Sequence, residues 1–404
     1  MLYTQYFLSK YIEIFLLGTL ILTLTIFQSM NYKSDKLCII YNFAPHYREA
    51  IFKKIDSVYN CDWYFGESQN GIKELTYSLL KSVRRFKSIG KPGKFIWQLG
   101  ILPLLFKKEY QTFFMLADSH TLSNWLFFFL APILTPRKKV YIWTHGWYGK
   151  ESDKEAKLKL WLYRRVSGVF LYGNYAKNLL IKKGIDENKL YVLHNSLDYD
   201  KQLSLRNNLQ PSIIFSEHFN NNNPTLIFIG RLTPVKRLDL LIEAIAILKK
   251  RGVECNVVLV GDGKQKDFLQ DLVQEHNLGQ NFWFYGACYD NVKNAELIYN
   301  ADLCVSPGNV GLTAMHSLVF GTPVITHNDF KWQMPEFESI IPGVTGDFFY
   351  RDDVDSLVMV INKWIWDKRN LRQEVRNDCF KEIDSSWTPD FQINVIQEHI
   401  KIGN

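Results

Sequence analysis

The chain has 404 residues, of which 47% are hydrophobic, 22% charged and 15% aromatic. This composition supplies enough apolar surface for packed cores and excludes a disordered, collagenous or low-complexity protein. The length fits two large domains or three smaller ones, at ~150 residues per domain. The formal net charge is +7, and Glu74 is the one acid in the otherwise basic segment 72–108. Such a segment could meet phosphates, nucleic acid or anionic lipid.

The six cysteines are scattered and form no CxxC pair. Neither a zinc site nor a disulfide framework is therefore indicated, and a reducing cytoplasm is the simplest setting.

Residues 1–29 form an apolar N-terminal segment separate from the predicted fold. Its run 12–27 contains Glu13 and is shorter than the ~20 apolar residues that a bilayer span needs. No small-residue cleavage site follows, which disfavours a secretory signal. A membrane anchor and a misassigned leader upstream of Met30 remain as the alternatives. In each case the globular fold is expected to begin near Lys36.

Short apolar runs alternate with helical patterns in the first half of the chain. Strands are predicted at 37–41, 112–116, 140–144, 168–172 and 189–194, with helices at 49–58 and 154–165. This alternation predicts a parallel, doubly wound α/β sheet in a domain over residues 36–200.

The polar, Asn-rich segment 201–223 is predicted to be a linker. Alternation resumes in a second domain over residues 224–380, with strands at 225–229, 256–260, 282–285, 303–306 and 323–326. Residues 381–404 are expected to form a tail that packs back on the first domain.

Three predicted strands of the second domain end in loops suited to a phosphate-bearing ligand. The loop positions are Gly230, Gly261, Gly263, Gly308, Asn309, Val310, Gly311 and Leu312. Arg231 and Lys236 follow the first of these strands and could meet a diphosphate. The loop at 308–312 leads into a predicted helix at 313–320, and the N-terminus of this helix favours an anion. A helix-opening GxGxxG is missing, so a nicotinamide site is disfavoured.

The order GRL, K-R, VGDG, ADL-x-V-S-P, GL, GTPVI and PG-x-TG resembles the C-terminal half of the retaining GT-B glycosyltransferases of family 4 (glycosyl transferases group 1). The resemblance covers residues ~225–350. It implies two Rossmann-like, doubly wound domains facing a central cleft, with the acceptor on 36–200 and a nucleotide-sugar on 224–380. It also implies that Arg231 and Lys236 hold the diphosphate. The nucleotide-sugar is then a substrate, and no cofactor is expected.

This chain departs from the family at two positions. The family usually carries two glutamates eight residues apart, and the aligned residues here are Gly308 and His316. His316 could still hydrogen-bond a ribose hydroxyl, whereas Gly308 offers only its backbone N–H. The acceptor for a donor-sugar hydroxyl must then come from elsewhere, with Glu336 or Glu338 as the nearest candidates and Glu336 as our choice.

The first domain is expected to supply the acceptor side. Pro45, His46 and Arg48 follow the first strand, where the family's Gly-Gly turn is missing. His145 ends a predicted strand at the edge of the sheet and is the candidate catalytic group of this domain. Trp147 suits the apolar face of a sugar.

Two Asp-x-Asp matches raise the question of a metal. Asp198 to Asp200 lie in a segment that resembles the turn ending the family's N-terminal domain, and Asp353 to Asp355 open a helix. Neither is interpreted as a metal site. The leaving diphosphate would then be stabilised by Arg231, Lys236 and the helix N-terminus after Val310.

The resemblance implies a metal-independent, retaining glycosyltransferase of the hexosyltransferase type. It would move a sugar from a nucleotide-sugar to a saccharide or lipid-linked hydroxyl acceptor, in bacterial surface polysaccharide or glycolipid synthesis. Two alternatives stay open: a sugar-nucleotide epimerase on the same fold, and a non-catalytic nucleotide-sugar binding protein. No nucleic-acid partner is expected.

The expected location is the cytoplasm, at the inner face of the cytoplasmic membrane. The basic side chains at positions 81, 84, 85, 87, 91 and 94 precede an apolar, aromatic run at 95–106. This pattern is typical of a segment that lies in a membrane interface, although a core helix with a solvated basic flank would give it as well.

Overall fold

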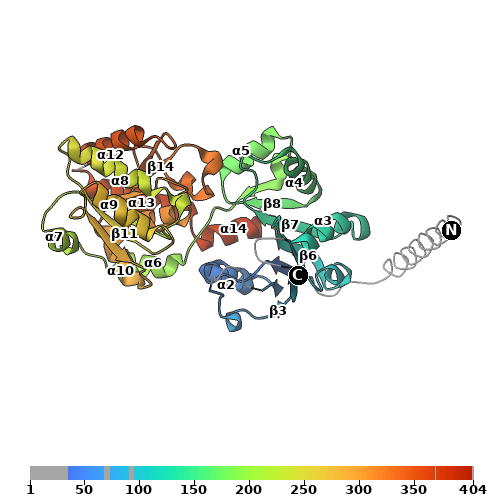
Figure 1. Ribbon diagram of the computed structural model, residues 1–404. Coiled ribbons are helices and arrows are strands. Elements are labelled where there is room, and N and C mark those ends of the chain that lie inside the picture. The colour runs from blue at the N-terminus through green and yellow to red at the C-terminus, as the bar shows by residue number, and fades with distance from the viewer. Residues whose placement is uncertain (1–34, 68–72, 91–94, 369, 403–404) are drawn as a thin grey trace.

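The computed structural model describes residues 35–67, 73–90, 95–368 and 370–402. They fold into two α/β domains, each built on a parallel sheet (Figure 1). The doubly wound α/β class predicted from the sequence is confirmed. The predicted leader at 1–29, Lys91 and Lys94 lie outside the described residues.

The sheet of the N-terminal domain has the strand order β3-β2-β1-β6-β7-β8-β9, with all neighbours parallel. Its strands are β1 (Lys36–Tyr41), β2 (Cys61–Phe65), β3 (Val83–Arg85), β6 (Tyr110–Leu116), β7 (Lys139–Thr144), β8 (Gly168–Leu171) and β9 (Leu190–Val192). The chain moves outward from β1 to β3 and then restarts on the other side of β1. The point of reversal lies between β1 and β6.

Helices cover both faces of this sheet. The helical elements are η1 (His46–Arg48), α2 (Glu49–Val58), η2 (Tyr77–Leu79), η3 (Leu102–Phe106), α3 (Leu122–Leu134), α4 (Asp153–Arg165), α5 (Asn174–Lys182) and η4 (Glu187–Lys189). A separate antiparallel hairpin pairs β4 (Ser88–Gly90) with β5 (Ile96–Gln98). One face packs on η3, α3, α4 and α5, and the other packs on α2.

The C-terminal domain repeats this plan with the parallel strand order β12-β11-β10-β13-β14-β15. The strands are β10 (Thr225–Ile229), β11 (Asn256–Val260), β12 (Phe282–Gly286), β13 (Leu303–Val305), β14 (Val324–His327) and β15 (Gly346–Phe349). The order reverses between β10 and β13. Buried aliphatic side chains from the sheet and its helices form one continuous core.

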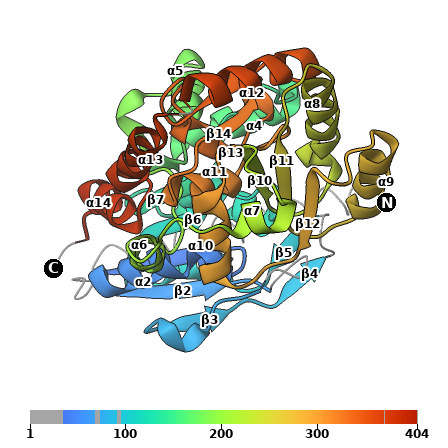
Figure 2. The ribbon, with the colours of Figure 1, turned by 90° about the vertical axis from the view of Figure 1, so that its left-hand side faces the viewer.

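The helical elements of this domain are η5 (Pro234–Lys236), α8 (Leu238–Lys250), α9 (Lys266–Glu275), α10 (Asn291–Asn300), α11 (Leu312–Val319), η6 (Phe330–Trp332), η7 (Pro335–Ser339), α12 (Val354–Lys368) and α13 (Arg372–Ser386). α12 lies against α8 on one side of the sheet, as Figures 1 and 2 show. On the other side α11 packs against α13.

The segment 201–223, predicted to be a linker, is instead largely helical. It contains most of α6 (Tyr199–Arg206) and all of α7 (Ile214–Phe219). Phe215 is buried in the core of the C-terminal domain, and Arg206 forms an ion pair with Asp384 at 2.8 Å. Apolar residues that lie between the asparagines in the sequence pack on the core of the C-terminal domain, so the segment belongs to that domain.

The C-terminal residues cross back to the N-terminal domain. α13 runs through the expected boundary at residue 380, and α14 (Pro389–His399) then packs against α2 (Figure 1). Ile393, Ile396 and Ile400 are buried in the core of the N-terminal domain. The chain therefore crosses between the domains twice, once after β9 and once before α14.

Candidate functional site

The two sheets turn their carboxyl ends toward each other. Asn174, which follows β8, meets Glu338, which follows β14. In open α/β sheets, ligands bind outside the carboxyl ends of the strands where the strand order reverses. The candidate site should therefore lie beyond β1 and β6 in one domain and beyond β10 and β13 in the other.

The N-terminal domain has a pocket at this place. Its volume is about 500 Å³, and it is lined by residues after β1, β6, β7 and β8. The lining includes Pro45, Tyr47, Arg48, Asp118, His145, Tyr148, Lys159 and Tyr172. Two of the predicted acceptor residues, Pro45 and Arg48, and the predicted catalytic residue His145 therefore share one pocket. We call it the acceptor-side pocket.

Arg48 is the best-connected side chain of this pocket. Its guanidinium donates to Asn195 Oδ1 at 2.7 Å and to Tyr172 Oη at 2.6 Å. The guanidinium carbon also lies 4.9 Å from the ring centroid of Tyr172. Arg48 is buried, so these partners hold a desolvated positive charge in one orientation.

Glu336 carries this network into the C-terminal domain. Its Oε1 accepts a hydrogen bond of 2.5 Å from Asn195 Nδ2, the amide that also binds Arg48. Among the described residues its Oε2 has no hydrogen-bond partner, although the side chain is only 2% exposed. A buried carboxylate oxygen without a partner is costly and is a strong acceptor for an incoming hydroxyl.

Lys236 binds the backbone of the loop at 308–312. Its Nζ donates to the carbonyl oxygens of Asn309 at 2.6 Å and Val310 at 3.3 Å. Burial lowers the pKa of Lys236 to about 8, Glu336 opposes this shift, and Arg231 reinforces it. Lys236 is therefore within electrostatic reach of both Glu336 and Arg231, and the side chain of Arg231 is exposed.

Gln333 fixes the same loop from the other side. Its Oε1 accepts from the Val310 N–H at 2.9 Å, and its Nε2 donates to Thr326 Oγ1 at 2.8 Å. The Val310 N–H is thus bound within the protein, whereas the predicted diphosphate contact concerns the helix N-terminus that follows Val310. At the start of α11 the Ala314 N–H donates to the Gly311 carbonyl at 3.1 Å, and the N–H groups of Leu312 and Thr313 precede the first intrahelical bond.

Close packing of the loops explains the glycines. A Cβ at Gly261 would overlap the carbonyl oxygen of Gly230, and one at Gly263 would overlap that of Leu232. These glycines therefore let the loops after β10 and β11 stack on each other. Their role is to shape the donor-side edge, and Gly230 belongs to the same stack.

Gly308 is packed in the same way, which explains one departure from the family pattern. A Cβ there would overlap the carbonyl oxygen of Val235, and the Gly308 N–H donates to the Lys236 carbonyl at 2.9 Å. The glutamate of the family has no room at this position. The loop at 308–312 lies directly against the backbone of Val235 and Lys236, which leaves space only for glycine.

Placing the family's glutamate at position 308 should therefore destabilise the protein. We expect Gly308→Glu and Gly308→Ala to lower the free energy of unfolding by about 2–4 kcal/mol each, because overpacking at a rigid backbone contact forces the loop to move. Urea unfolding at neutral pH measures the effect. Gly343→Ala is the control for a glycine-to-alanine change without overpacking. A Cβ at Gly343 meets open space, so the cost there comes only from its positive φ of 74°. Equal stability of Gly308→Ala and the parent protein would contradict the packing.

Both candidate histidines are held neutral. Burial, with help from Arg48 and Lys159, lowers the pKa of His145 to about 4, and its Nδ1 has no hydrogen-bond partner among the described residues. Burial also lowers the pKa of His316 to about 4. Each imidazole therefore offers a neutral donor or acceptor near pH 7.

Glu338 joins the domains beside this centre. Its carboxylate accepts from the backbone N–H groups of Asn174 at 2.7 Å and Tyr175 at 2.6 Å, at the start of α5. Lys150 from the N-terminal domain lies 4.1 Å from the ring centroid of Trp332. Glu338 is thus occupied by the interface, which leaves Glu336 as the carboxylate with a free oxygen.

Two predicted acceptor residues lie elsewhere. Trp147 is 4% exposed and belongs to the hydrophobic core, since its apolar ring fills the space under α5. His46 is exposed, and its Nδ1 lies 3.2 Å from the Lys73 carbonyl, outside the acceptor-side pocket. Asn195, Tyr172 and Gln333 were not predicted.

The two Asp-x-Asp segments begin helices. Asp198 accepts from the Lys201 N–H at 3.4 Å, and Asp353 accepts from the Ser356 N–H at 2.9 Å. Both carboxylates therefore act as helix caps.

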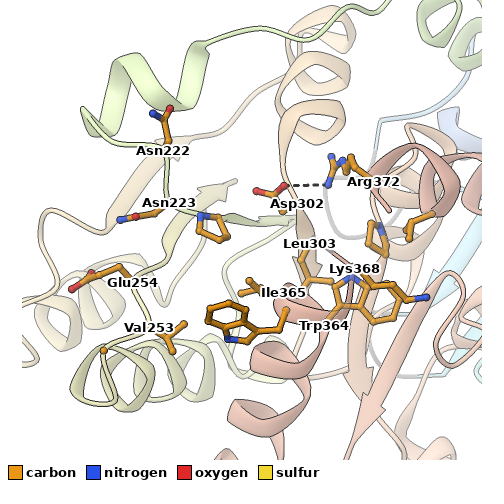
Figure 3. A pocket seen from close by; sticks show the side chains of 15 residues that line it. Asn222, Asn223, Val253, Glu254, Asp302, Leu303, Trp364, Ile365, Lys368 and Arg372 are labelled. Atoms are coloured by element: carbon orange, nitrogen blue, oxygen red, sulfur yellow. Dashed lines mark ion pairs between the residues drawn. The ribbon is translucent and has the colours of Figure 1, made fainter. Parts of the chain in front are cut away.

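A further pocket of about 360 Å³ lies at the opposite, amino-end edge of the C-terminal sheet (Figure 3). Its charged side chains are already engaged. Asp302 accepts from the Thr225 N–H at 2.8 Å and pairs with Arg372 at 3.5 Å, and Glu254 accepts from Asn281 at 3.1 Å. We assign no ligand to it.

Among the described residues, no helix combines the length and apolar character needed to span a membrane.

Comparisons with known proteins agree with this geometry. Residues 210–381 match the family model described as Glycosyl transferases group 1. A glycogen synthase of Mycobacterium tuberculosis (strain CDC 1551 / Oshkosh) is 27% identical over 154 residues, 37% of this chain and 36% of that protein. A GDP-mannose-dependent alpha-(1-6)-phosphatidylinositol dimannoside mannosyltransferase of M. tuberculosis (strain ATCC 25177 / H37Ra) is 33% identical over 103 residues, 25% of this chain and 26% of that protein. The chain thus matches about a third of the length of the first relative and a quarter of the second.

The whole fold resembles a solved structure. Anabaena Alr3699/HepE, crystallised in complex with UDP, matches with a TM-score of 0.67 and 17% identity over 90% of this chain and 99% of that one. The GT-B fold expected from the sequence is confirmed.

Proposed function

We propose that this chain, whose residues 210–381 match the glycosyl transferases group 1 model and which has a GT-B fold, is a glycosyltransferase. It would transfer a sugar from a nucleotide-sugar to a hydroxyl of a saccharide or lipid-linked acceptor, with retention and without a metal. Assembly of a bacterial surface polysaccharide or glycolipid is the proposed setting.

One observation carries the proposal. A buried chain of contacts runs from Arg48 through Asn195 to Glu336 and joins the acceptor-side pocket to the loops of the C-terminal domain. Glu336 ends this chain with an oxygen that has no partner among the described residues. An acceptor hydroxyl and a donor sugar could therefore meet at one carboxylate between the two switch points.

The residues divide into donor and acceptor roles. Arg231, Lys236 and the start of α11 would hold the diphosphate and stabilise the negative charge that grows on it as the glycosidic bond breaks. Glu336 Oε2 would accept a hydroxyl of the donor sugar. His145 would orient the reacting sugar as a neutral imidazole, because its low pKa keeps it uncharged.

The interface would also protect the reaction from water. The bonds from the start of α5 to Glu338 of η7 and the Lys150–Trp332 contact would close the two domains around the centre. Closure of this kind favours transfer to an acceptor over hydrolysis. Support for a nucleotide-sugar donor comes from the match to a structure bound to UDP.

The test is a panel of nucleotide-sugars incubated with the protein and a mixture of hydroxyl acceptors, in EDTA. We expect one donor to release its nucleoside diphosphate in step with glycoside formation, because Arg231 and Lys236 would stabilise the leaving group without a metal. NMR of the product anomer should show retention.

Loss of all transfer in EDTA, restored by manganese or magnesium, would contradict the metal-free mechanism. Isomerisation of the donor in the absence of acceptor would instead support an epimerase. Donor binding without turnover would support a non-catalytic binding protein.

A further inference from the structure

α3 and α4 lie side by side on the outside of the N-terminal domain (Figure 1). Both helices carry exposed apolar side chains. The rings of Phe129 on α3 and Trp161 on α4 stack with their centroids 5.7 Å apart. We call this surface the α3–α4 face.

The apolar residues of α3 form a regular stripe. Leu122, Phe129 and Ile133 are 42%, 50% and 54% exposed, and the half-buried Leu126 lies between them. Their spacing of four, three and four residues places them on one side of the helix. The buried Phe127 and Phe128 face the core. A continuous apolar stripe opposite a well-packed core marks an interaction surface.

The neighbouring side of α4 adds positive charge. A shallow hollow of about 450 Å³ is lined by Lys157, Leu160, Trp161, Arg164 and Arg165. The guanidinium carbon of Arg165 lies 4.9 Å from the Trp161 ring centroid. The acids of α4, Asp153 and Glu155, lie in its first turn, and Glu155 pairs with Lys159 at 2.8 Å. The hollow itself is therefore basic, and Arg164, one of its three cations, also donates to the Lys183 carbonyl at 3.3 Å.

We propose that the α3–α4 face docks on an anionic lipid bilayer, with a lipid phosphate seated in the hollow of α4. The exposed Phe129 and Ile133 would enter the boundary between headgroups and acyl chains, and the three cations of the hollow would pair with headgroup phosphates. Trp161 suits this boundary because its ring is apolar and its N–H is polar. Charge complementarity thus selects a membrane over a neutral protein surface.

This face differs from the segment that the sequence indicated. Lys81 donates to the Asp56 carbonyl, Arg84 donates to Tyr64 Oη at 3.1 Å, and Arg85 pairs with Glu74 at 3.6 Å. Of the apolar run at 95–106, Ile96, Ile101, Leu104 and Leu105 are core residues. Phe95, Leu99 and Phe106 of this run are exposed, so the fold uses only part of the predicted pattern. The α3–α4 face differs in that Arg165 contacts Trp161, whose ring stacks on Phe129 of the exposed apolar stripe.

Docking would also serve the proposed transfer. Trp125 of α3 and Lys159 of α4 line the acceptor-side pocket, so the helices that would meet lipid also form a wall of the site. Resting on the proposed function, this implies an acceptor whose hydroxyl is carried by a membrane lipid. The docking itself is independent of catalysis.

The test places an environment-sensitive fluorophore on the full chain at Ile133→Cys and, as a control, at Met359→Cys on α12, which is 60% exposed. The unsubstituted chain corrects for labelling of the half-buried Cys288. Vesicles contain phosphatidylcholine with or without phosphatidylglycerol, and brominated acyl chains serve as the quencher. We expect a blue shift and quenching at position 133 with anionic vesicles only, and neither at position 359.

Removing the positive charges of the hollow should weaken the binding of the α3–α4 face to anionic vesicles. The variant Lys157→Gln/Arg164→Gln/Arg165→Gln should need roughly 100-fold more lipid for half-maximal quenching at position 133, because each base near an anionic surface contributes a factor of about five. The matched control, Lys250→Gln/Lys363→Gln/Lys381→Gln, removes three exposed bases from the C-terminal domain and should dock like the parent.

Identical signals at positions 133 and 359 with anionic vesicles would overturn the proposal, even if another part of the chain attaches the protein. Equal docking on phosphatidylcholine alone would overturn the headgroup site. The triple variant should keep its transfer rate with a soluble acceptor, so a failure of docking is distinct from a failure of the proposed activity.

Discussion

Glu336→Gln should lower kcat/KM for sugar transfer by about 30- to 150-fold, which corresponds to ~2–3 kcal/mol for one buried hydrogen bond to a charged group. The substitution preserves the shape of the side chain and an oxygen for Asn195 Nδ2. It removes the negative charge beside Lys236 and turns the free acceptor oxygen into a donor. Steady-state kinetics with the preferred donor measures the loss.

The chain offers a matched control in the same short helix η7. Glu338→Gln also neutralises a carboxylate, but that carboxylate binds the start of α5. Its effect should stay below about tenfold, because it weakens only one contact between the domains. Unfolding curves check that both variants keep the fold. If the two variants lose activity equally, Glu336 has no role beyond the interface.

Lys236→Met should lower kcat/KM by about 30- to 1000-fold, or ~2–4 kcal/mol, the usual cost of removing one preorganised charge partner of a transition state. Methionine keeps most of the apolar stem but loses the bonds to the Asn309 and Val310 carbonyls. Part of the loss could thus come from a displaced loop.

Arg231→Ala removes a positive charge without removing the hydrogen bonds that hold the loop at 308–312. Arg231 is exposed, so its removal should leave the fold intact and still cost ~2–4 kcal/mol in kcat/KM if it contacts the diphosphate. Lys264→Ala, at an exposed lysine in the neighbouring loop, should have little effect. Parental rates in both Arg231→Ala and Lys236→Met would show that the phosphate site is misplaced.

Much of the fold was predictable because parallel strands are continuous apolar runs. The predicted strands at 225–229 and 256–260 coincide with β10 and β11. β2 was missed because Asp62 interrupts its run. That aspartate is buried, and it accepts a hydrogen bond of 2.6 Å from Tyr110 and pairs with Lys36 at 3.4 Å. Because these partners are distant in the sequence, the residues around Asp62 do not indicate that its charge can be buried in a strand.

The donor-side loops were predictable for a similar reason, since glycines and cations directly follow strand ends. The centre of the site was only partly predictable. Arg48 and Glu336 were named from their local sequence, yet the amide that joins them, Asn195, lies 141 positions from Glu336. Contacts at such separations depend on how the two domains meet, and a single sequence contains no spacing that reports this.

The same limit explains the errors at Trp147 and in the segment 201–223. Tryptophan at a strand end is equally suited to a sugar and to a core, and here it is in the core. Asparagines suggested a linker, but isolated apolar residues such as Phe215 dock the segment on a surface that only the fold creates.

The most direct test of the central claim, a diphosphate site built on Lys236 and facing Glu336, is a calorimetric titration of nucleoside diphosphates at several pH values. Because burial lowers the pKa of Lys236 to about 8, the free lysine loses its charge as the pH rises through 8. Affinity for the preferred diphosphate should then fall by up to about tenfold per pH unit above 8, and Lys236→Met should bind more weakly with a flat profile over this range. A protein that binds no nucleoside diphosphate, or one whose affinity and pH profile are the same in Lys236→Met, would contradict the account.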